Sequence, residues 1–429
     1  MGEQSLRWIE PAPTRWLGRA EVTKFLRRAI EASPERLALY ERLGLALLAE
    51  GKAREALEAF RKIADASPAD FGSWGKLAEC YSRLGEPAQA LACCDRGETH
   101  GRGAGVAGAR GAALEALGRP DAALHWYRIA FAEDPDAEVV LESLLRCLSR
   151  LPDGQPLLDF CDELPAAERF AAQRRAFRAL ALSRLGRSDE ARALIDPARH
   201  AMIFRFEPPA AYGGLEAFNR RLADWLLANT GSVATPAPDF VLDDSLVRLH
   251  PPEMQDLRAF FRASLEAFVS DIPAMGLGQI MPPPTAGALV DTAVFLRRGG
   301  RNGEHVHPGG YVSGVYYVES PPSVRDGADQ RGRLILGPCE RLTEGHRPAW
   351  ETRWIKPEPG MLVVFPSHMF HDVAPTQDDA VRISIAFDLR LGPGQEPGRR
   401  SAGPEVEGEA DARLVGAVRE GPVIGVGGK

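Results

Sequence analysis

A repeat of about 34 residues in the first half of the chain restricts its fold more than any other feature of the sequence. The segments GKAREAL, GEPAQAL, GRPDAAL and GRSDEAR begin at Gly51, Gly85, Gly118 and Gly186. The steps between these glycines are 34, 33 and 68 residues, and the last step is twice the period. Self-similarity at this period is typical of arrays in which each short unit buries its apolar face against its neighbours. We therefore predict an α-solenoid in this half.

Other residue types recur at the same spacing. Small residues stand where two helices would cross closely, at Ala56, Ala90 and Ala123. The position four residues later is aromatic in Phe60 and Tyr127, whereas the middle copy has Cys94. Prolines, which cannot continue a helix, end the units at Pro34, Pro68 and Pro135. A degenerate copy is expected near LPDGQPLLDF, where the series of leading glycines has a gap.

With these positions taken together, residues 18–198 resemble the tetratricopeptide repeat, a helix–turn–helix unit that stacks into a superhelix. The resemblance implies a concave surface that binds a protein or peptide partner. A spacer or a dimerisation arm is the alternative interpretation. Residues 1–17 are predicted to form an N-terminal extension.

From residue 199 onward the pattern changes to short strands. They are ALVDTAVFL, YVSGVYYVE, GRLILG, ETRWIK, GMLVVF, HDVAP and VRISIAFDL, separated by Gly and Pro. This punctuation is typical of an antiparallel barrel or sandwich. Two supporting helices are predicted ahead of the strands, and TPAPDFVLDDSL between these helices is predicted to be a loop. The domain would end at residue 390, and residues 391–429, rich in Gly, Pro and Glu, are predicted to be disordered.

Composition excludes several classes of function. A net charge of −7 over 429 residues gives no basic footprint, so no nucleic-acid partner is expected. Apolar stretches fall short of a membrane span, and the N-terminal segment lacks the pattern of a signal peptide. The six cysteines form no CxxC pair and are expected to be free thiols. We therefore expect a cytoplasmic protein without a membrane partner.

A small set of polar residues in the second half points to a metal site. His305 and His307 are two residues apart, so in a strand they point to the same face. His371 lies 66 residues further on, at the start of another predicted strand, and Arg382 follows after 11 more residues. Fe(II) held on one face by three protein groups keeps open positions for a chelating co-substrate and O₂. An arginine on a neighbouring strand can bind the far carboxylate of that co-substrate through two hydrogen bonds, and Ser384, facing the same way, can add a hydroxyl.

The segments HVHPGGYVSGVYYV, GRLILG, PEPGMLVVFPSHMFH and RISIAFD together resemble the 2-oxoglutarate- and Fe(II)-dependent oxygenases, in a bacterial branch whose oxygenase domain follows tetratricopeptide repeats. The resemblance covers residues 200–390 and implies a double-stranded β-helix. It implies His305 and His371 as iron ligands and Arg382, assisted by Ser384, as the residue that binds the 5-carboxylate of 2-oxoglutarate. Tyr317 resembles a position that hydrogen-bonds the co-substrate. O₂ and 2-oxoglutarate would be converted to succinate and CO₂ while a substrate is oxidised.

His307 departs from the wider superfamily, in which a carboxylate stands at this position. Three interpretations remain open. His307 is the third ligand of a three-histidine site; or His307 is the first ligand and the following HPG leaves water in place of the carboxylate; or the site is degenerate and the domain only binds. Glu304 and Asp372 are poor substitutes, because in strands they would point to the opposite face.

The remaining histidines have no partner pattern. His100, His125, His200, His250 and His346 are expected to be surface residues or hydrogen-bonded ones. His368 is expected at the surface, with a contact to the substrate or to the metal ligands as the alternative. Trp350 and Trp354 would either line a substrate mouth or pack in the barrel.

The leading functional hypothesis is a dioxygenase that hydroxylates a protein or peptide held by the repeats. The alternative from a different class is an interaction protein whose barrel is a non-catalytic binding module. A third hypothesis is an oxygenase that acts on a small molecule and uses its repeats for assembly.

Overall fold

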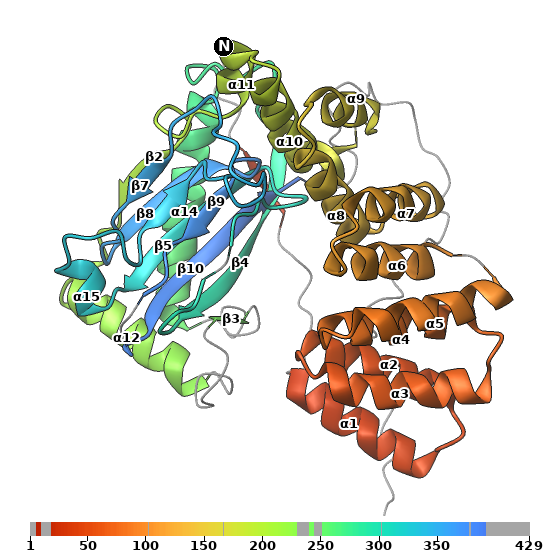
Figure 1. Cartoon of the computed structure of the whole chain (residues 1–429). Coiled ribbons are helices and arrows are strands. Elements are labelled where there is room, and N and C mark those ends of the chain that lie inside the picture. Colours follow the sequence, from red (N-terminus) through yellow and green to blue (C-terminus); the bar gives the residue numbers. More distant parts are fainter. Residues whose placement is uncertain are drawn as a thin grey trace, which may run out of the picture.

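A helical array stands beside a β-sandwich in the computed structural model (Figure 1). The structure describes residues 6–9, 19–101, 103–165, 167–229, 240–243, 251–301, 303–376 and 379–391. The predicted fold class, an α-solenoid followed by a β-barrel domain with supporting helices, is confirmed. Within the described residues no helix is both long and apolar enough to cross a membrane.

The array consists of antiparallel helices that pack in sequence order. They are α1 (Arg19–Ala32), α2 (Leu37–Ala49), α3 (Ala53–Ala66), α4 (Phe71–Arg83), α5 (Pro87–His100), α6 (Ala104–Ala116), α7 (Pro120–Glu133), α8 (Glu138–Ser149), α9 (Gln155–Glu163), α10 (Ala171–Arg184) and α11 (Ser188–Leu194). The degenerate copy expected near residue 154 is the pair α8 and α9. A single 3₁₀ turn, Glu168–Phe170, precedes α10.

The recurring glycines end the first helix of each pair. Gly51, Gly85, Gly118 and Gly186 have φ between 70° and 75°, the left-handed region that side chains with a Cβ adopt at a cost. Their amides form the helix-terminating hydrogen bonds, for example from Gly51 to Leu48 O at 3.1 Å. The sequence period is therefore the period of these turns.

Helix crossings inside the units match large residues with small ones. A Cβ on Gly44 would lie 2.5 Å from the ring of Phe60, and a Cβ on Gly111 would lie 2.6 Å from the ring of Tyr127. In the middle unit the corresponding positions are Ala78 and Cys94, both fully buried. In this unit the partner is Ala78, whose methyl group takes the space that glycine leaves in the other units, and the smaller Cys94 stands where they have an aromatic ring.

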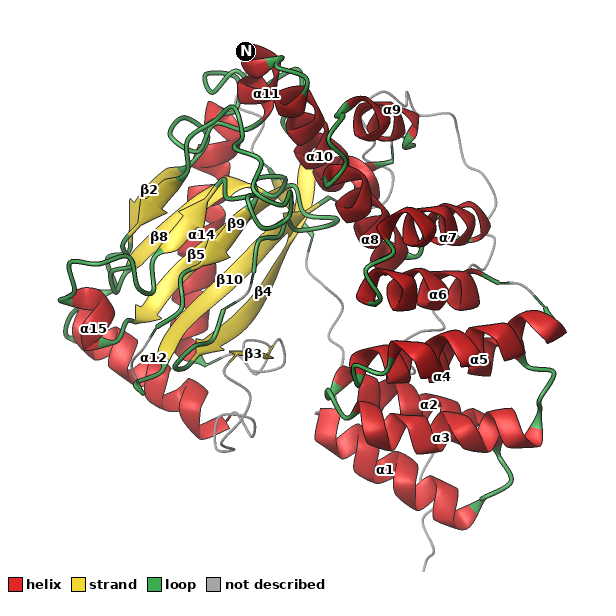
Figure 2. Cartoon of the chain, in the orientation of Figure 1, coloured by secondary structure: helices red, strands yellow, loops and turns green. Residues whose placement is uncertain are grey.

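The second half folds into two sheets (Figure 2). The main sheet has the order β1-β4-β10-β5-β8-β2, with β3 also paired to β4, and the smaller sheet has the order β7-β6-β9. The strands are β1 (Arg7–Trp8), β2 (Met202–Arg205), β3 (Phe240–Asp243), β4 (Ala286–Leu296), β5 (Val312–Glu319), β6 (Leu334–Leu336), β7 (Arg353–Ile355), β8 (Met361–Pro366), β9 (His371–Val373) and β10 (Arg382–Arg390). Only the pair β1/β4 is parallel among the described strands.

The two faces of the main sheet have different roles. Odd-numbered residues of β10, such as Ile385 and Phe387, pack against the predicted helices α12 (Leu215–Asn229) and α14 (Pro252–Asp271) in one apolar core. Even-numbered residues of the same strand face a pocket between the sheets. A 3₁₀ turn, Ala210–Tyr212, and a short helix, α15 (Pro322–Arg325), complete the domain.

Helix α10 joins the array to the barrel. Buried apolar side chains of α8 to α11 and of the smaller sheet belong to one continuous core. The rings of Phe177 on α10 and Phe370 meet edge to face, with centroids 5.5 Å apart. Arg184 donates to the carbonyl of Thr343 at 2.9 Å, in the loop between β6 and β7. The array is thus packed onto the barrel rather than attached by a linker.

His368 lies in this junction, which corrects its expected surface position. Its side chain is 1% exposed, and Nε2 lies 2.8 Å from the carbonyl oxygen of Leu194 on α11. Because a carbonyl can only accept, Nε2 carries the proton. Burial lowers the pKa of His368 from 6.5 to about 3, so the ring is neutral.

Two segments differ from the predicted loops and extensions. Part of the segment TPAPDFVLDDSL forms β3 on the edge of β4. Arg7 and Trp8, inside the predicted N-terminal extension, pair with Ala286 and Gly287 of β4. Hydrogen bonds to the backbone of β4 stabilised both segments beyond what their own composition indicated. Of the C-terminal tail predicted to be disordered, residues 391–429, all but Leu391 lie outside the described residues.

Removing the aromatic contact at the junction should destabilise the whole molecule. Phe177 is 3% exposed, so Phe177→Ala should lower the free energy of unfolding by about 3–5 kcal/mol, through lost apolar burial and a cavity. Phe25, which is 54% exposed on α1, offers a matched control, and Phe25→Ala should change it by about 0.5 kcal/mol or less. Urea unfolding followed by tryptophan fluorescence measures both. Equal effects of the two variants would contradict the continuous core.

Acid should weaken the junction through His368. The unfolded chain takes up a proton near pH 6.5, whereas the folded chain does so only near pH 3, so the stabilisation is complete above pH 6.5 and is lost progressively as the pH falls toward 3. His368→Gln keeps a donor for Leu194 O but cannot titrate. Its melting temperature should therefore fall less than that of the wild type between about pH 7.5 and about pH 4.5. The exposed His100→Gln is the control, and parallel curves for all three proteins would contradict the assignment.

Candidate metal centre

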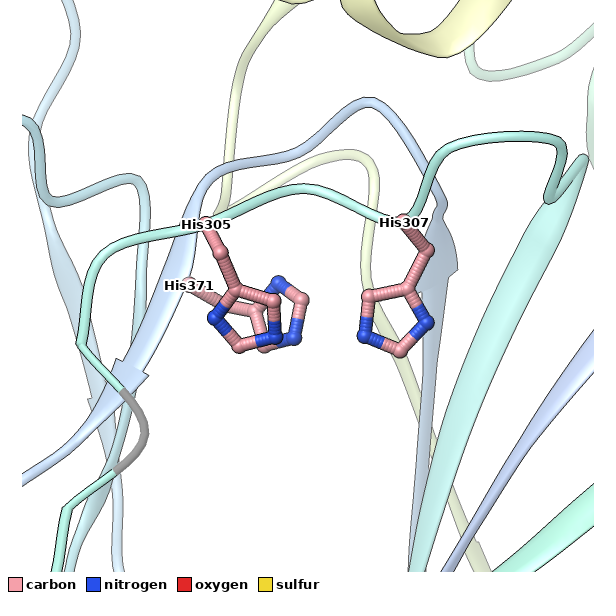
Figure 3. A group of neighbouring side chains, drawn as sticks. All are labelled: His305, His307 and His371. Carbon is pink, nitrogen blue, oxygen red and sulfur yellow. The ribbon is translucent and has the colours of Figure 1, made fainter. Parts of the chain in front are cut away.

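Three histidines lie close together in the pocket between the sheets, and Figure 3 shows their side chains. One ring nitrogen from each of His305, His307 and His371 lies within 4.8 Å of the others. His305 and His307 come from the segment between β4 and β5, and His371 is the first residue of β9. The backbones of His305 and His371 exchange N–H···O bonds of 3.1 and 3.0 Å, which brings the two ligand-bearing segments together.

A tight turn fixes His307. The amide of Gly310 donates to His307 O at 3.1 Å, with Pro308 at the second position of the turn and Gly309 at the third. Gly309 has a φ of 69°, as a type II turn requires at this position. The amide of His307 also donates to Ser367 O at 3.0 Å. The HPGG sequence is therefore the local signal that sets the direction of the His307 side chain.

The Nδ1 atom of every ring is already engaged. His305 Nδ1 lies 2.9 Å from Gly303 O, and His371 Nδ1 lies 3.1 Å from Met369 O. Because these carbonyls only accept, both rings carry the proton on Nδ1 and the lone pair on Nε2. His307 Nδ1 lies 2.5 Å from Asp388 Oδ1. Such partners on the far nitrogen are typical of metal-binding histidines, since they orient the ring and raise its basicity.

Asp388 is a site residue that the sequence reasoning missed. Its Oδ1 also accepts from Ser313 Oγ at 2.7 Å, and its side chain is largely buried. Burial raises the pKa of Asp388, but His307 and Ser313 outweigh it and hold the pKa below the usual value, so the carboxylate stays ionised. A signal was present, because Asp388 follows Arg382 and Ser384 at even spacing along one strand.

Burial keeps the imidazole rings of His305 and His371 neutral. It lowers the pKa of His305 to about 4, with the neighbouring His307 as the next cause. The pKa of His371 lies well below 6.5 for the same reason, with His305 and His307 adding to the effect. Neutral imidazole is the form that binds a metal ion.

The carboxylates next to the histidines in sequence, Glu304 and Asp372, contact other partners. Glu304 accepts from the amides of Arg341 and Leu342 at 3.1 and 2.9 Å, so it ties the loop between β6 and β7 to the histidine segment. Asp372 pairs with Arg301. Both side chains are thus occupied away from the histidine cluster.

The pocket has a volume of about 340 Å³ and deepens along β4 and β10. At its closed end Leu296 and Arg382 are each 1% exposed. Toward the other end Val290 is half-buried and Arg390 is exposed. Asp388, which holds His307, lies between the two ends, so the histidines stand between a sealed compartment and an open mouth.

The remaining sequence-predicted residues gather at the closed end. Ser384 on β10 pairs with Tyr317 on β5, and both are buried. The guanidinium of Arg382 lies 5.0 Å from the centre of the Tyr317 ring. Arg382 Nε and Tyr317 Oη are buried without a hydrogen-bond partner among the described residues. Burial lowers the pKa of Arg382 and raises that of Tyr317.

The two tryptophans considered in the sequence, Trp350 and Trp354, lie in different surroundings. Trp350 is buried in the junction core, and its Nε1 donates to Gly337 O at 2.8 Å, so it packs rather than lines a mouth. Trp354 is 39% exposed and lies on the outer side of the smaller sheet, in a shallow depression with Arg331 and Pro375.

Two parts of the chain match known families. Residues 293–388, which contain the three histidines, Asp388 and Arg382, match the family described as "Putative 2OG-Fe(II) oxygenase". Residues 47–113 match the tetratricopeptide repeat. Both resemblances stated from the sequence are confirmed. No curated protein matches the chain.

Several solved structures are similar to parts of the chain. A prolyl-4-hydroxylase from Pseudomonas putida is 17% identical, covering 46% of this chain and 95% of its own, with a TM-score of 0.28. The first tetratricopeptide domain of human RPAP3 is 24% identical, covering 27% of this chain and 91% of its own, with a TM-score of 0.25. YrrB, a repeat protein with a peptide-binding site, is 15% identical, covering 40% and 93%, with a TM-score of 0.31.

Neutralising Asp388 should weaken metal binding without unfolding the site. In Asp388→Asn the amide oxygen can still accept from His307 Nδ1, but the negative charge behind the ring is lost. Fe(II) affinity, measured anaerobically by competition with a chelating dye, should fall about 10- to 100-fold. Asp379→Asn, at a residue 84% exposed, is the matched control and should bind as the wild type does. His307→Ala should weaken binding further, and wild-type affinity in that variant would remove His307 from the ligand set.

Proposed function

We propose that the second half of the chain is a dioxygenase that uses Fe(II) and 2-oxoglutarate to hydroxylate a protein or peptide. The observation that carries the proposal is Arg382. It is a fully buried cation with no carboxylate partner among the described residues, at the closed end of a pocket that also holds three converging imidazoles. An unpaired buried charge is costly unless a ligand compensates it.

A dicarboxylate fits both features of the pocket. Its distal carboxylate can accept two parallel hydrogen bonds from Arg382. Ser384 and Tyr317 can each donate a hydroxyl proton to the same group. Its other end, a 2-oxo acid, can chelate a metal ion that three imidazoles leave open on one side. Three imidazoles alone would suit zinc equally well, so Arg382 is what favours the iron and 2-oxoglutarate interpretation.

Each group of residues in the pocket would have its own role in the reaction. His305, His307 and His371 would hold Fe(II), which with 2-oxoglutarate supplies the activation of O₂. Asp388 keeps the proton of His307 on Nδ1, so that Nε2 faces the metal. Leu334, Phe365 and Val373 form the apolar wall that excludes water around the ligands.

The repeat array favours a macromolecular substrate. Residues 47–113 match a repeat that presents an extended concave surface, and such surfaces bind peptide segments. The array is packed directly on the barrel through α10, so a partner bound to it is held beside the domain that would oxidise it. O₂ and a protein or peptide are therefore the partners that we propose.

One observation favours a second candidate, an interaction protein whose barrel is a non-catalytic binding module. No carboxylate joins the histidine cluster among the described residues. A domain that had lost catalysis could retain Arg382 for binding an acidic ligand, and the experiment below separates the two.

Anaerobic titration of the full chain with Fe(II) and then 2-oxoglutarate should produce the weak visible charge-transfer band of a chelated complex. Arg382→Ala should weaken 2-oxoglutarate binding by about 2–5 kcal/mol, because a charged hydrogen-bonded pair is lost. It should leave Fe(II) binding in place, since Arg382 does not belong to the histidine cluster. His371→Ala should lose both the metal and the band.

The exposed Arg205→Ala, on the far edge strand β2, is the control for the loss of an arginine. A band that persists in Arg382→Ala would overturn the role of that residue. Wild-type protein that binds Fe(II) but gives no band would favour the binding-module candidate.

A further inference from the structure

The open end of the pocket carries a cation of its own. Arg390 lines the pocket at the end opposite Arg382, four alternate positions further along the same face of β10. Its side chain is 51% exposed, and its ion pair with Asp388 Oδ2 is a long one, at 3.6 Å. Asp388 is already committed to His307 and Ser313. The guanidinium is therefore available to a ligand that enters from solvent.

A second arginine lies on the same face. Arg7 on the edge strand β1 pairs with Ala286, and Arg390 pairs with Ala288, two residues further along β4. Paired neighbours share a face, and so do residues i and i+2 of one strand. Arg7 and Arg390 thus flank β4 on the pocket side, and Arg7 is exposed. With strands about 4.8 Å apart and a rise of about 3.4 Å per residue, their Cα atoms are separated by roughly 12 Å.

Apart from Asp388, the lining between the mouth and the histidines carries no negative charge among the described residues. Val290, Val306 and Pro308 are apolar, and Thr292 is neutral. Asp388 is the one acidic side chain lining the pocket within the described ranges. A ligand at the mouth therefore meets cations at the rim and a mostly apolar passage toward the histidines.

We propose that the mouth selects an acidic peptide segment, with Arg390 and Arg7 binding two carboxylates that flank the residue to be oxidised. A separation of roughly 12 Å corresponds to three or four residues of extended chain. This inference rests on the proposed function, since it names the substrate class of the same site.

The test uses the full-length protein and three pools of fluorescent random peptides of equal length, which differ only in being acidic, neutral or basic. Equilibrium binding is measured by fluorescence anisotropy in the presence of Fe(II) and 2-oxoglutarate without O₂. The acidic pool should bind most tightly, and added salt should weaken it most. Arg390→Glu should weaken binding of the acidic pool about three- to tenfold, Arg390→Lys should restore most of it, and adding Arg7→Glu should weaken it further.

Arg205→Glu is the matched control, because Arg205 is 54% exposed but lies on β2 at the opposite edge of the sheet. It should leave binding of the acidic pool unchanged, which separates the mouth from the general charge of the molecule. Equal binding of the three pools, or an acidic pool insensitive to Arg390→Glu, would overturn the proposal. Competition by a small dicarboxylate as strong as that by the acidic peptides would also overturn it, in favour of a small-molecule substrate.

A failure of the acidic-peptide proposal can be distinguished from a failure of the proposed oxygenase function. The visible band of wild-type protein with Fe(II) and 2-oxoglutarate tests the metal site and Arg382 without any peptide. A normal band together with equal binding of all pools would reject only the acidic substrate. Loss of the band with Arg390-dependent binding of acidic peptides would reject the oxygenase and keep the mouth as a peptide site.

Discussion

The candidate site depends on hydrogen bonds made by the nitrogens that face away from its centre. Carbonyls of Gly303 and Met369 and the carboxylate of Asp388 each hold one Nδ1, so all three rings turn Nε2 toward one point. The carbonyls sit in backbone segments that the His305–His371 pairing brings together. Without these partners a histidine can present either nitrogen, and the cluster would lose its common direction.

Charge explains why a third histidine is compatible with this site. Three neutral imidazoles leave the full charge of a divalent metal uncompensated, whereas two histidines and a carboxylate remove one unit. Asp388 supplies a negative charge on the far side of His307, and this charge would act on a bound metal through the imidazole ring rather than through a direct bond. Arg382 stands at the far end of the pocket, so the two ends of a dicarboxylate would each meet positive charge.

The sequence predicted much of this arrangement because its signals were periodic or local. The 34-residue spacing identified the array, and even spacing in β10 identified Arg382 and Ser384 as neighbours. Asp388 obeyed the same spacing but resembled an ordinary strand-end acid, and only its contact with His307 reveals its role. The burial of His368 and the pairing of β1 and β3 arise from contacts between segments far apart in sequence, which no local pattern encodes.

The packing of α10 on the barrel fixes the distance between the end of the repeat array and the pocket. Phe177, Phe370 and the surrounding core hold α8 to α11 against the smaller sheet. A segment anchored on the repeats would therefore reach the histidines only after a set length of chain. Selectivity could then come from the number of residues between anchor and target, because a sequence with the right chemistry at the wrong interval would not reach the histidines.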